Sequence, residues 1–482
     1  MLKSLPSIFL VLSFKIYSPI NTLPFNEKYD YKEALSLSLL FYEAQRSGPL
    51  PPDNRIPWRG DSALHDTGQN GEDLSGGYYD ASDFVKFGFT MTFSTTLLAW
   101  GLLSYKDAYK YAGQYKYGLE AVKWATDYFV KCHPSAYEFY GQVGDFSTDH
   151  RFWGRPEDLN MSRPAYKIDK DHPGSDLAGE AAAALAASSL VFRETNKTYA
   201  DIILKHAEEL FDFATTYRGL YNDVIPGAKK FYEVSGYGDE ITWAAIWLYK
   251  ATRKLKYLEQ AEQYYTEFRL KERPNEFFYN KKVAGLQLLL ALETKRPEYN
   301  NAILNFCNFT IYDQKRTPKG LIYIDKFGTL SHAANVAFVC LQASEIEEYG
   351  SNFVNFAREQ IDYVLGSAGR SFVVGYGKNY PRKPHHSASS CPDRPLPCGW
   401  DNYHSKDPNP QILYGAVVSG PDENDYYEDS REEFLYNEVT LDYNAGFQGV
   451  VAGLIYFDNK DNSNTIEKKT SPSHDDLKLL NA

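Results

Sequence analysis

Residues 76–100 read GGYYDASDFVKFGFTMTFSTTLLAW, in which two aspartates stand directly before a long apolar run. The run predicts a helix over residues 83–104, with Asp80 and Asp83 three residues apart at its start. Side-chain oxygens at a helix start commonly accept hydrogen bonds from free N–H groups, so both aspartates have an ordinary interpretation as helix caps. The rest of the sequence decides whether they also carry chemistry.

The same helical periodicity extends over nearly the whole chain, and hardly any segment reads as a strand. The expected helices, about twelve, are 31–46, 83–104, 116–131, 174–194, 198–216, 238–252, 256–271, 281–294, 297–309, 330–348, 351–366 and 442–457. The loops between them are short, so successive helices are expected to pack as antiparallel neighbours. Six such pairs can close into an (α/α)6 barrel with its loops at one end, although periodicity alone fits a solenoid or a plain bundle equally well.

Two segments, 133–173 and 367–441, are too long to be simple connections, and long loops in compact domains are usually functional. No linker divides the chain, so we expect one domain over 21–458. The Lys-containing apolar stretch at 1–20 predicts a signal peptide, and the polar stretch at 459–482 predicts a disordered tail. The N-x-[ST] sequons at Asn160, Asn196 and Asn308 fit a secreted protein.

Composition narrows the classes of protein that the chain can represent. Of its 482 residues, 43% are hydrophobic and 24% charged, which is typical of a soluble globular protein. The formal net charge of −12, with no basic cluster, argues against a nucleic-acid partner. After the N-terminal stretch, no apolar run is long enough to cross a bilayer. The 39 Tyr, 29 Phe and 7 Trp fit either core packing or flat platforms for sugar rings, and composition does not separate the two.

The five cysteines are too few for a disulfide scaffold. Cys391 and Cys398 flank the loop CPDRPLPC and can bridge if this loop doubles back. Cys132, Cys307 and Cys340 lie in helical patterns, where we expect buried thiols. No Cys/His spacing of the zinc type is present, so the sequence predicts no metal thiolate site.

A further acidic residue stands before the last apolar helix, in YYEDSREEFLYNEVTLDYNAGF (426–447). Glu438 lies there among Tyr and Phe residues, and desolvation by aromatic walls would raise its pKa. Asp80 and Asp83, at an expected helix N-terminus, would instead be held ionised by the helix dipole. Glycoside hydrolysis requires such a pair, one neutral carboxyl and one carboxylate. Read alone, Glu438 equally well caps the helix 442–457 or makes a surface ion pair.

Several longer segments resemble glycoside hydrolase family 9, from about residue 29 to 457. The C-terminal signature of that family is similar to YEDSREEFLYNEVTLDYNA (427–445), and a second signature to SFVVGYGKNYPRKPHH (371–386). GGYYDASD (76–83) resembles the family's GGYYDAGD. The remaining matches are RFWGRPEDLNMSRPAYKIDKDHPGSDLAGE (151–180) and FYEVSGYGDEITWA (231–244). Within the family, the secreted endoglucanases of animals look most similar.

The resemblance implies a single (α/α)6 barrel that hydrolyses a β-1,4-linked glucan internally, with inversion and without an organic cofactor. In that scheme Asp83 is the general base on water, Asp80 holds the same water, and Glu438 is the general acid. His385 and Asp429 match family positions in the active site. The family positions that line the cleft are matched by His150, Trp153, Tyr232 and Tyr443.

The same resemblance implies a calcium site in the segment SGYGDE (235–240). Its oxygen ligands would be Ser235, Gly236, Asp239 and Glu240, with Asn280 at a position where the family usually has Asp. Without the resemblance, Asp239 and Glu240 read simply as the start of a helix.

Two departures from the family pattern concern the cleft. Ser82 replaces a glycine, which would add strain if this position has a positive φ. Ser387 replaces an arginine, which removes a forked donor for sugar oxygens. We expect activity with altered preference, and two alternatives stay open: hydrolysis of xylan, xyloglucan or a mixed-linkage glucan, and a non-catalytic glycan-binding protein. We expect the protein to be a secreted, digestive monomer whose binding partner is its polysaccharide substrate.

Overall fold

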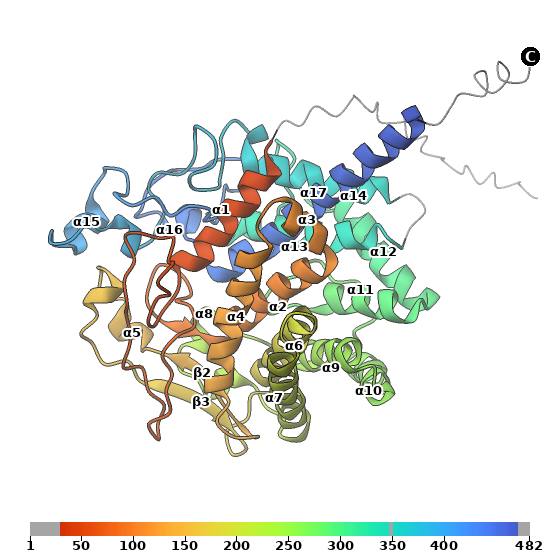
Figure 1. Ribbon diagram of the computed structural model, residues 1–482, viewed down its shortest axis with the longest axis horizontal. Helices are drawn as coiled ribbons and strands as arrows, with labels where there is room; N and C mark the ends of the chain where they lie inside the picture. The colour runs from red at the N-terminus through yellow and green to blue at the C-terminus, as the bar shows by residue number, and fades with distance from the viewer. Residues whose placement is uncertain (1–28, 347–349, 471–482) are drawn as a thin grey trace, which may run out of the picture.

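The computed structural model describes residues 29–346 and 350–470, and within them twelve long helices form two rings (Figure 1). The inner ring consists of α2 (Gly88–Ser104), α6 (Ser175–Phe192), α9 (Gly238–Thr252), α11 (Val283–Thr294), α13 (Thr329–Ala343) and α17 (Leu441–Thr470). The outer ring consists of α1 (Tyr31–Ala44), α4 (Tyr115–Cys132), α7 (Lys197–Thr216), α10 (Leu255–Glu267), α12 (Pro297–Tyr312) and α14 (Ser351–Asp362). All twelve expected helices are present, with ends that differ by at most five residues except for the last, α17, which extends beyond the expected end at 457 to Thr470.

The inner ring is closed, which confirms the (α/α)6 barrel. Each inner helix packs against the next in chain order, and α17 packs against both α13 and α2. The outer helices α7, α10, α12 and α14 each pack against the inner helix that precedes them in the chain. The first helix, α1, packs against the last, α17. This contact between the two ends of the domain completes the sixth pair.

Local sequence explains which helices lie inside. The inner helices α2, α6 and α11 are apolar or small-residue on almost all sides, as in the AGEAAAALAASS run of α6, and a helix that is apolar all round is buried. The outer helices α4, α7, α10 and α14 are amphipathic. Trp100 of α2 and Trp243 and Trp247 of α9 interlock in the core, with all three ring-centroid distances between 5.5 and 5.6 Å. Offset and edge contacts of this kind fill space between neighbouring helices.

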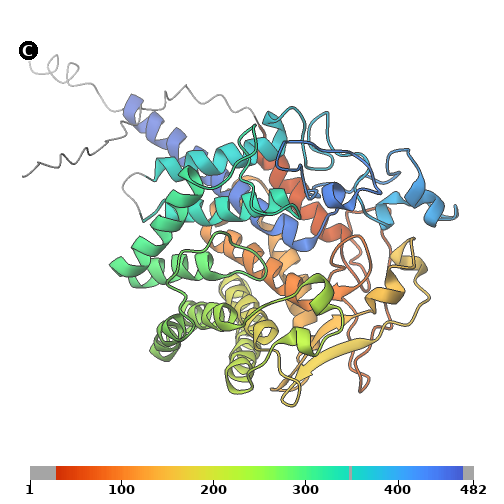
Figure 2. The same cartoon turned by 180° about the vertical axis from the view of Figure 1, so that it is seen from behind.

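The loops and short elements gather at one end of the barrel, at the left in Figure 1 and at the right in Figure 2. The short helices are α3 (Lys106–Tyr111), α5 (Phe146–Asp149), α8 (Ala228–Phe231), α15 (Trp400–His404) and α16 (Phe434–Asn437), with single turns η1 (Pro156–Asp158), η2 (Tyr221–Asp223), η3 (Tyr363–Ser367) and η4 (Ala388–Ser390). Of these, α5, α8, α15 and α16 belong to the loop end (Figure 1). The two predicted long loops contribute most of it.

A small antiparallel sheet corrects the predicted start of the helix 83–104. Its strands are β1 (Lys86–Phe87), β2 (Glu138–Val143) and β3 (Ala165–Asp169), in that order, with Lys86 opposite Val143 and Glu138 opposite Asp169. Because residues 86–87 pair with β2, α2 begins only at Gly88. Asp80 and Asp83 therefore lie in a loop before a strand and do not cap a helix.

The ends of the chain lie partly outside the described residues. The predicted signal peptide at 1–20 falls entirely outside them. At the other end α17 continues to Thr470, into the stretch expected to be a polar tail, and residues 471–482 are again outside. Across the part of the chain that is described, we find no helix with the length and apolar character needed to span a membrane.

The cysteine prediction was wrong for one pair. Cys307 of α12 and Cys340 of α13 form a disulfide, with Cα atoms 5.5 Å apart, instead of two buried thiols. They are 33 residues apart in sequence, and only the packing of α12 on α13 brings them together. Cys391 and Cys398, for which the sequence left a bridge open, form a disulfide, and Cys132 is a buried free thiol as expected.

Candidate active site

An open cleft of about 760 Å³ lies at the loop end of the barrel. It brings together residues that are far apart in the chain, from Asp80 to Tyr443. Among the predicted site residues, those that line it are Asp80, Asp83, His150, Trp153, Tyr232, Asn280, His385, Glu438 and Tyr443. Both serines that depart from the family pattern, Ser82 and Ser387, line it as well.

Asp83 lies at the wall of this cleft with its side chain 20% exposed. The Nε2–H of His150 donates to Asp83 Oδ2 at 2.7 Å, and Asp83 Oδ1 accepts from the backbone N–H of Val85 at 3.3 Å. The hydrogen bond to Asp83 is the main reason why the pKa of His150 is raised. A carboxylate that is held by a hydrogen bond from His150 and still borders the cleft is suited to act as a base.

Asp80 is more deeply placed, with only 1% of its surface exposed. Its carboxyl oxygens accept hydrogen bonds from the hydroxyls of Thr90 and Tyr232, and its backbone oxygen accepts from Leu441 N at 3.0 Å. Burial, followed by the charge of Asp442, raises the pKa of Asp80 well above its ordinary value. The prediction that a helix dipole keeps Asp80 ionised was therefore wrong, because no helix begins at Asp80 and desolvation dominates.

Glu438 follows α16 directly, and its backbone N–H donates to Phe434 O at 2.9 Å. Burial raises the pKa of Glu438 to about 8, and the negative charges of Asp83 and Asp442 add to this effect. The predicted direction of the shift is confirmed. The carboxyl is therefore protonated at neutral pH and can act as a general acid.

Asp442 is an acidic cleft residue that the sequence analysis missed, as are Glu276 and Asp325. It is buried in the first turn of α17, and Thr440 Oγ1 donates to its Oδ1 at 2.5 Å, while its Oδ2 has no hydrogen-bond partner among the described residues. Burial raises the pKa of Asp442 to about 6, so it is largely ionised at neutral pH and raises the pKa of both Asp80 and Glu438. Its spacing of four residues from Glu438 was a signal that could have found it.

His385 is fixed in one tautomer beside these carboxyls. Its Nδ1 lies 2.6 Å from the backbone oxygen of Arg431, and a carbonyl oxygen can only accept, so Nδ1 carries the proton. Burial lowers the pKa of His385, which leaves the ring neutral and its Nε2 an acceptor. The ring also packs against Trp153, with centroids 5.3 Å apart. A neutral imidazole acceptor in the cleft can receive a hydrogen bond from a sugar hydroxyl.

Asp429 does not line the cleft, although the resemblance implied a place in the active site. Its two carboxylate oxygens accept from the backbone N–H groups of Arg382 and Lys383, each at 2.9 Å. These residues lie just before His385 in the chain. Asp429 therefore acts on the site at a distance, by holding the loop that carries His385.

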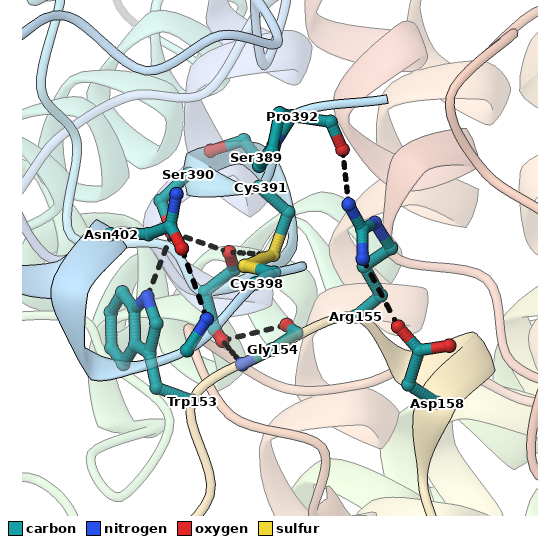
Figure 3. Close-up of a disulfide and its surroundings, with 12 residues drawn as sticks. Trp153, Gly154, Arg155, Asp158, Ser389, Ser390, Cys391, Pro392, Cys398 and Asn402 are labelled. Carbon is teal, nitrogen blue, oxygen red and sulfur yellow. Dashed lines mark hydrogen bonds and ion pairs between the residues drawn. A yellow bond between two sulfur atoms is a disulfide. The ribbon is translucent and has the colours of Figure 1, made fainter. Parts of the chain in front are cut away.

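Ser387 lines the cleft and at the same time joins two loops. Its Oγ donates to the backbone oxygen of Gly154 and accepts from the N–H of Gly154, both at 2.8 Å. Figure 3 shows the same junction, with Trp153 Nε1 donating to Ser390 Oγ at 2.7 Å and the Cys391–Cys398 bridge behind it. The loop that carries Trp153 and the loop that carries His385 thus form one connected wall.

Ser82 causes no backbone strain, because it is not among the residues with a positive φ. Its backbone oxygen accepts from Ser387 N at 3.3 Å, so the two substituted positions are adjacent in space. The Ser82 hydroxyl is buried and has no hydrogen-bond partner among the described residues. The strain expected at this position is therefore absent.

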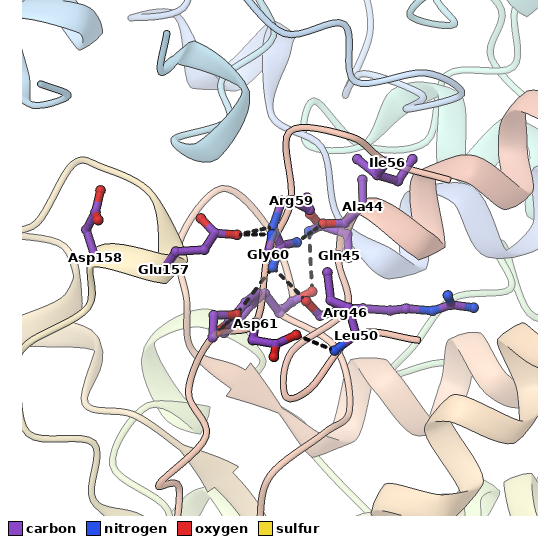
Figure 4. Close-up of polar contacts among 12 residues, drawn as sticks. Ala44, Gln45, Arg46, Leu50, Ile56, Arg59, Gly60, Asp61, Glu157 and Asp158 are labelled. Carbon is purple, nitrogen blue, oxygen red and sulfur yellow. Dashed lines mark hydrogen bonds and ion pairs between the residues drawn. The ribbon is translucent and has the colours of Figure 1, made fainter. Parts of the chain in front are cut away.

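A polar network behind the cleft holds the aspartate loop in place. Gln45 donates from Nε2 to the backbone oxygen of Ala81 at 2.8 Å, and its Oε1 accepts from His386 Nε2–H at 2.9 Å. In Figure 4, Arg59 lies beside Gln45, binds the backbone oxygens of Ala44 and Arg46, and pairs with Glu157 at 2.9 Å. Gln45, which directly follows α1, therefore ties the loop at Ala81 and the loop at His386 to the barrel.

Aromatic residues that the sequence analysis did not single out extend one side of the cleft. Trp400 and Tyr403 of α15 both line it, and both pack near Trp153, with centroid distances of 5.9 and 4.7 Å. Trp400 is 43% exposed, which leaves one part of its ring free to contact a ligand. Their position within a predicted long loop, where aromatic residues have no core to fill, was the available signal.

The residues expected to bind calcium lie around the start of α9. Asp239 Oδ2 accepts from the backbone N–H of Lys282 at 2.8 Å, and Asn280 donates to Glu233 O at 3.4 Å, so the segment around Asn280 is brought against the 233–240 turn. Glu240 is buried and pairs with the Lys282 ammonium at 3.2 Å.

This donor set fits a hard cation. Glu240 Oε2 is buried without a hydrogen-bond partner among the described residues. Burial and the adjacent carboxylate of Asp239 raise the pKa of Glu240 well above its usual value. Two adjacent carboxyl groups, near the exposed residues Ser235 and Gly236, offer the oxygen ligands that Ca²⁺ prefers.

Comparison with known proteins agrees with this geometry. A family model described as glycosyl hydrolase family 9 matches residues 31–451. Endoglucanase 13 of Arabidopsis thaliana is 43% identical, over 88% of this chain and 93% of its own. The endoglucanase structure of the termite Nasutitermes takasagoensis is 54% identical with a TM-score of 0.88, covering 89% of this chain and 99% of its own.

A structure of the cellulase Cel9M of C. cellulolyticum in complex with cellobiose is 35% identical, with a TM-score of 0.84, and covers 90% of this chain and 100% of its own. The family match spans every residue that lines the cleft. The chain belongs to glycosyl hydrolase family 9.

Proposed function

We propose that this glycoside hydrolase cleaves internal β-1,4 linkages of cellulose-type glucans with inversion of the anomeric centre. The observation that carries the proposal is the difference between two carboxyl groups in one cleft. Glu438 has its pKa raised to about 8, whereas Asp83 is hydrogen-bonded by His150 and partly exposed. The names of the relatives, which are endoglucanases and a cellulase bound to cellobiose, support the glucan as substrate.

In the proposed reaction, water attacks the anomeric carbon from the face opposite the leaving oxygen. Asp83 takes a proton from this water, and Glu438 gives its proton to the glycosidic oxygen as the carbon–oxygen bond breaks. Asp80 positions the water, since it precedes Asp83 by three residues in the same loop and lines the same cleft. Exchange of protons with solvent then returns both carboxyls to their starting states.

The proposed binding groups lie along the walls of the cleft. Trp153 and Tyr443 offer ring faces, and Trp400 extends the platform outwards. His150, His385 and Tyr232 supply hydrogen-bonding atoms near the carboxyls. Aromatic faces suit the apolar faces of sugar rings, while the polar groups fix the register of the chain.

The proposed function is tested by assaying the wild-type protein on carboxymethylcellulose, xylan, xyloglucan and mixed-linkage glucan. We expect reducing ends chiefly from carboxymethylcellulose, with a rapid fall in viscosity because cuts are internal. NMR of freshly cleaved cello-oligosaccharides should show the α-anomer first. Preference for another polymer would assign a different substrate, first release of the β-anomer would contradict inversion, and binding without release would favour a glycan-binding protein.

The pH dependence should reveal the raised pKa of Glu438. The acid must be protonated, so kcat/KM is expected to fall as pH rises through about 8. Asp442→Asn removes a negative charge that stabilises the protonated form, so the alkaline limb should move to lower pH. Asp53→Asn, at an exposed surface ion pair, is the matched control and should leave the profile unchanged. An unshifted limb in the Asp442 variant would show that another group sets it.

We also propose a structural calcium ion held by Ser235, Gly236, Asp239, Glu240 and Asn280. A bound cation would relieve the repulsion between the adjacent carboxyl groups and fasten the turn before α9. An ion at 100 times its Kd stabilises the folded state by about 2.7 kcal/mol. Calcium should therefore raise the melting temperature of the wild type and have little effect on Asp239→Asn. Equal shifts in both proteins would place the ion elsewhere.

Secretion is a further part of the proposal. Two disulfides, Cys307–Cys340 and Cys391–Cys398, are typical of proteins that fold in an oxidising compartment. The three sequon asparagines, Asn160, Asn196 and Asn308, are all exposed. Expression in a secreting eukaryotic host, followed by glycosidase treatment and mass measurement, would show which of them carry glycan.

A further inference from the structure

Two histidines and a glutamate meet on the outer ring, away from the cleft. His133 directly follows α4, and His206 and Glu209 lie on α7, three residues apart and hence on the same face of the helix. One ligand atom from each of the three side chains lies within 4.8 Å of the other two. None of the three lines the cleft, so the cluster is separate from the proposed active site.

The two imidazoles contact each other through like atoms. Nδ1 of His133 lies 2.7 Å from Nδ1 of His206, so one of these atoms must carry a hydrogen and the other a lone pair. His133 is only 3% exposed, and its Nε2 has no hydrogen-bond partner among the described residues. The described protein groups therefore leave one buried nitrogen of the histidine pair, Nε2 of His133, without a hydrogen bond.

Burial disfavours the positively charged form of both imidazole rings. Burial and the neighbouring His206 lower the pKa of His133 to about 4, and burial also lowers the pKa of His206. A neutral imidazole has a nitrogen lone pair that can bind a metal ion, whereas an imidazolium must first be deprotonated. The local environment thus disfavours imidazolium and suits a ligand that binds lone pairs.

The carboxylate of Glu209 is available to the same ligand. Its ion-pair partner is Lys205 at 3.4 Å, one turn earlier on α7. The Lys205 side chain is 75% exposed, and exposed pairs of this kind contribute little to stability. Displacement of Lys205 from Glu209 would therefore cost little.

We propose that His133, His206 and Glu209 bind a divalent transition-metal ion of the zinc class and so join the end of α4 to α7. Two imidazole nitrogens and a carboxylate are a donor set that zinc accepts, with water in a fourth position. At zinc–nitrogen bond lengths of about 2.0–2.1 Å in a tetrahedron, the two nitrogens would be about 3.3 Å apart. To bind the ion through both Nδ1 atoms, the two nitrogens need to separate slightly from their present contact, and the hydrogen that one Nδ1 carries must move to Nε2 of the same ring.

The adjacent Cys132 does not belong to this site. Its thiol is buried against Tyr128, which together with burial controls its pKa. The site is also distinct from the proposed calcium site, whose donors are all oxygen atoms on and around α9. Zinc affinity can therefore be measured with calcium in excess.

The test is zinc titration of the full, tag-free protein by calorimetry, with calcium in excess, for wild type and His206→Gln. The matched control is His172→Gln, which removes an exposed histidine that contacts one carboxylate, Asp169 at 3.2 Å, but no second imidazole. We expect micromolar or tighter binding of one zinc in the wild type and the control. In His206→Gln the affinity of this site should fall at least tenfold.

Cobalt provides a readout of geometry that simple surface binding would not give. An intense visible d–d spectrum, typical of four-coordinate cobalt, should form with the wild type and not with His206→Gln. Zinc should also raise the melting temperature of the wild type but not of the variant. Should His206→Gln fold poorly, Glu209→Gln, at a partly exposed position, serves in its place. Equal zinc affinity in wild type and variant, or no zinc binding at all, would overturn the proposal.

Discussion

Glu438→Gln is expected to lower kcat on carboxymethylcellulose by about 10²–10⁴-fold, the usual contribution of a general acid. The amide has nearly the shape of the carboxyl, so substrate binding should persist. Unlike the Glu438 carboxyl, whose pKa is raised to about 8, the amide has no acidic proton to donate. The departing sugar oxygen would then have to leave as an unprotonated alkoxide. Reducing-sugar release at saturating substrate measures the loss directly.

A substrate with an acidic leaving group separates this role from a general structural one. Dinitrophenyl cello-oligosaccharides need little protonation, so Glu438→Gln should hydrolyse them far better, relative to wild type, than it hydrolyses the polymer. Glu433→Gln, at an exposed glutamate in the same segment, is the control and should retain activity on both. Equal losses on both substrates would argue against the acid role.

Asp83→Ala is expected to abolish hydrolysis to a similar degree, about 10²–10⁴-fold, because water loses the base that takes its proton. The small side chain also opens space beside His150, whose hydrogen bond to Asp83 is broken. A small anion such as azide can enter that space and attack without a base. Azide should therefore restore turnover of an activated substrate and give an α-glycosyl azide.

Asp53→Ala is the surface control for this variant, because Asp53 makes only an exposed contact with Lys116 at 3.4 Å. Melting temperatures of both variants establish that they are folded. If Asp83→Ala kept more than a tenth of wild-type activity without azide, Asp83 would not be the base, and Asp80 would become the candidate. Asp80→Asn, tested beside it, distinguishes the two.

Much of the helical architecture could be predicted from local sequence. The apolar faces recur every 3.6 residues, so each of the twelve helices was visible by itself, from 31–46 to 442–457. The start of α2 was misplaced because β1 pairs with β2, some 50 residues later in the chain. A helix pattern carries no information about a strand partner that competes for its first residues.

At the site, too, the sequence predicted some features and the tertiary structure decided others. Motif resemblance selected Asp80, Asp83 and Glu438, and the cleft contains all three. It also selected Asp429, which the fold uses to hold a loop, and it missed Asp442, whose charge raises the pKa of Glu438. A motif identifies which residue types stand at which positions, but the role of each residue depends on where the fold directs its side chain.

The sequence by itself determined the helices and the family, because helical periodicity and the motif segments each depend on residues close together in the chain. It also placed Cys391 and Cys398 near enough in the chain to bridge if their loop doubles back. Only the tertiary structure decided that α17 closes the ring against α2, that Cys307 bonds to Cys340, and that Ser387 binds Gly154. It also decided that Asp80 is desolvated and not held ionised at a helix end. These features depend on contacts between distant segments and on the exclusion of water by the whole fold, neither of which local periodicity encodes.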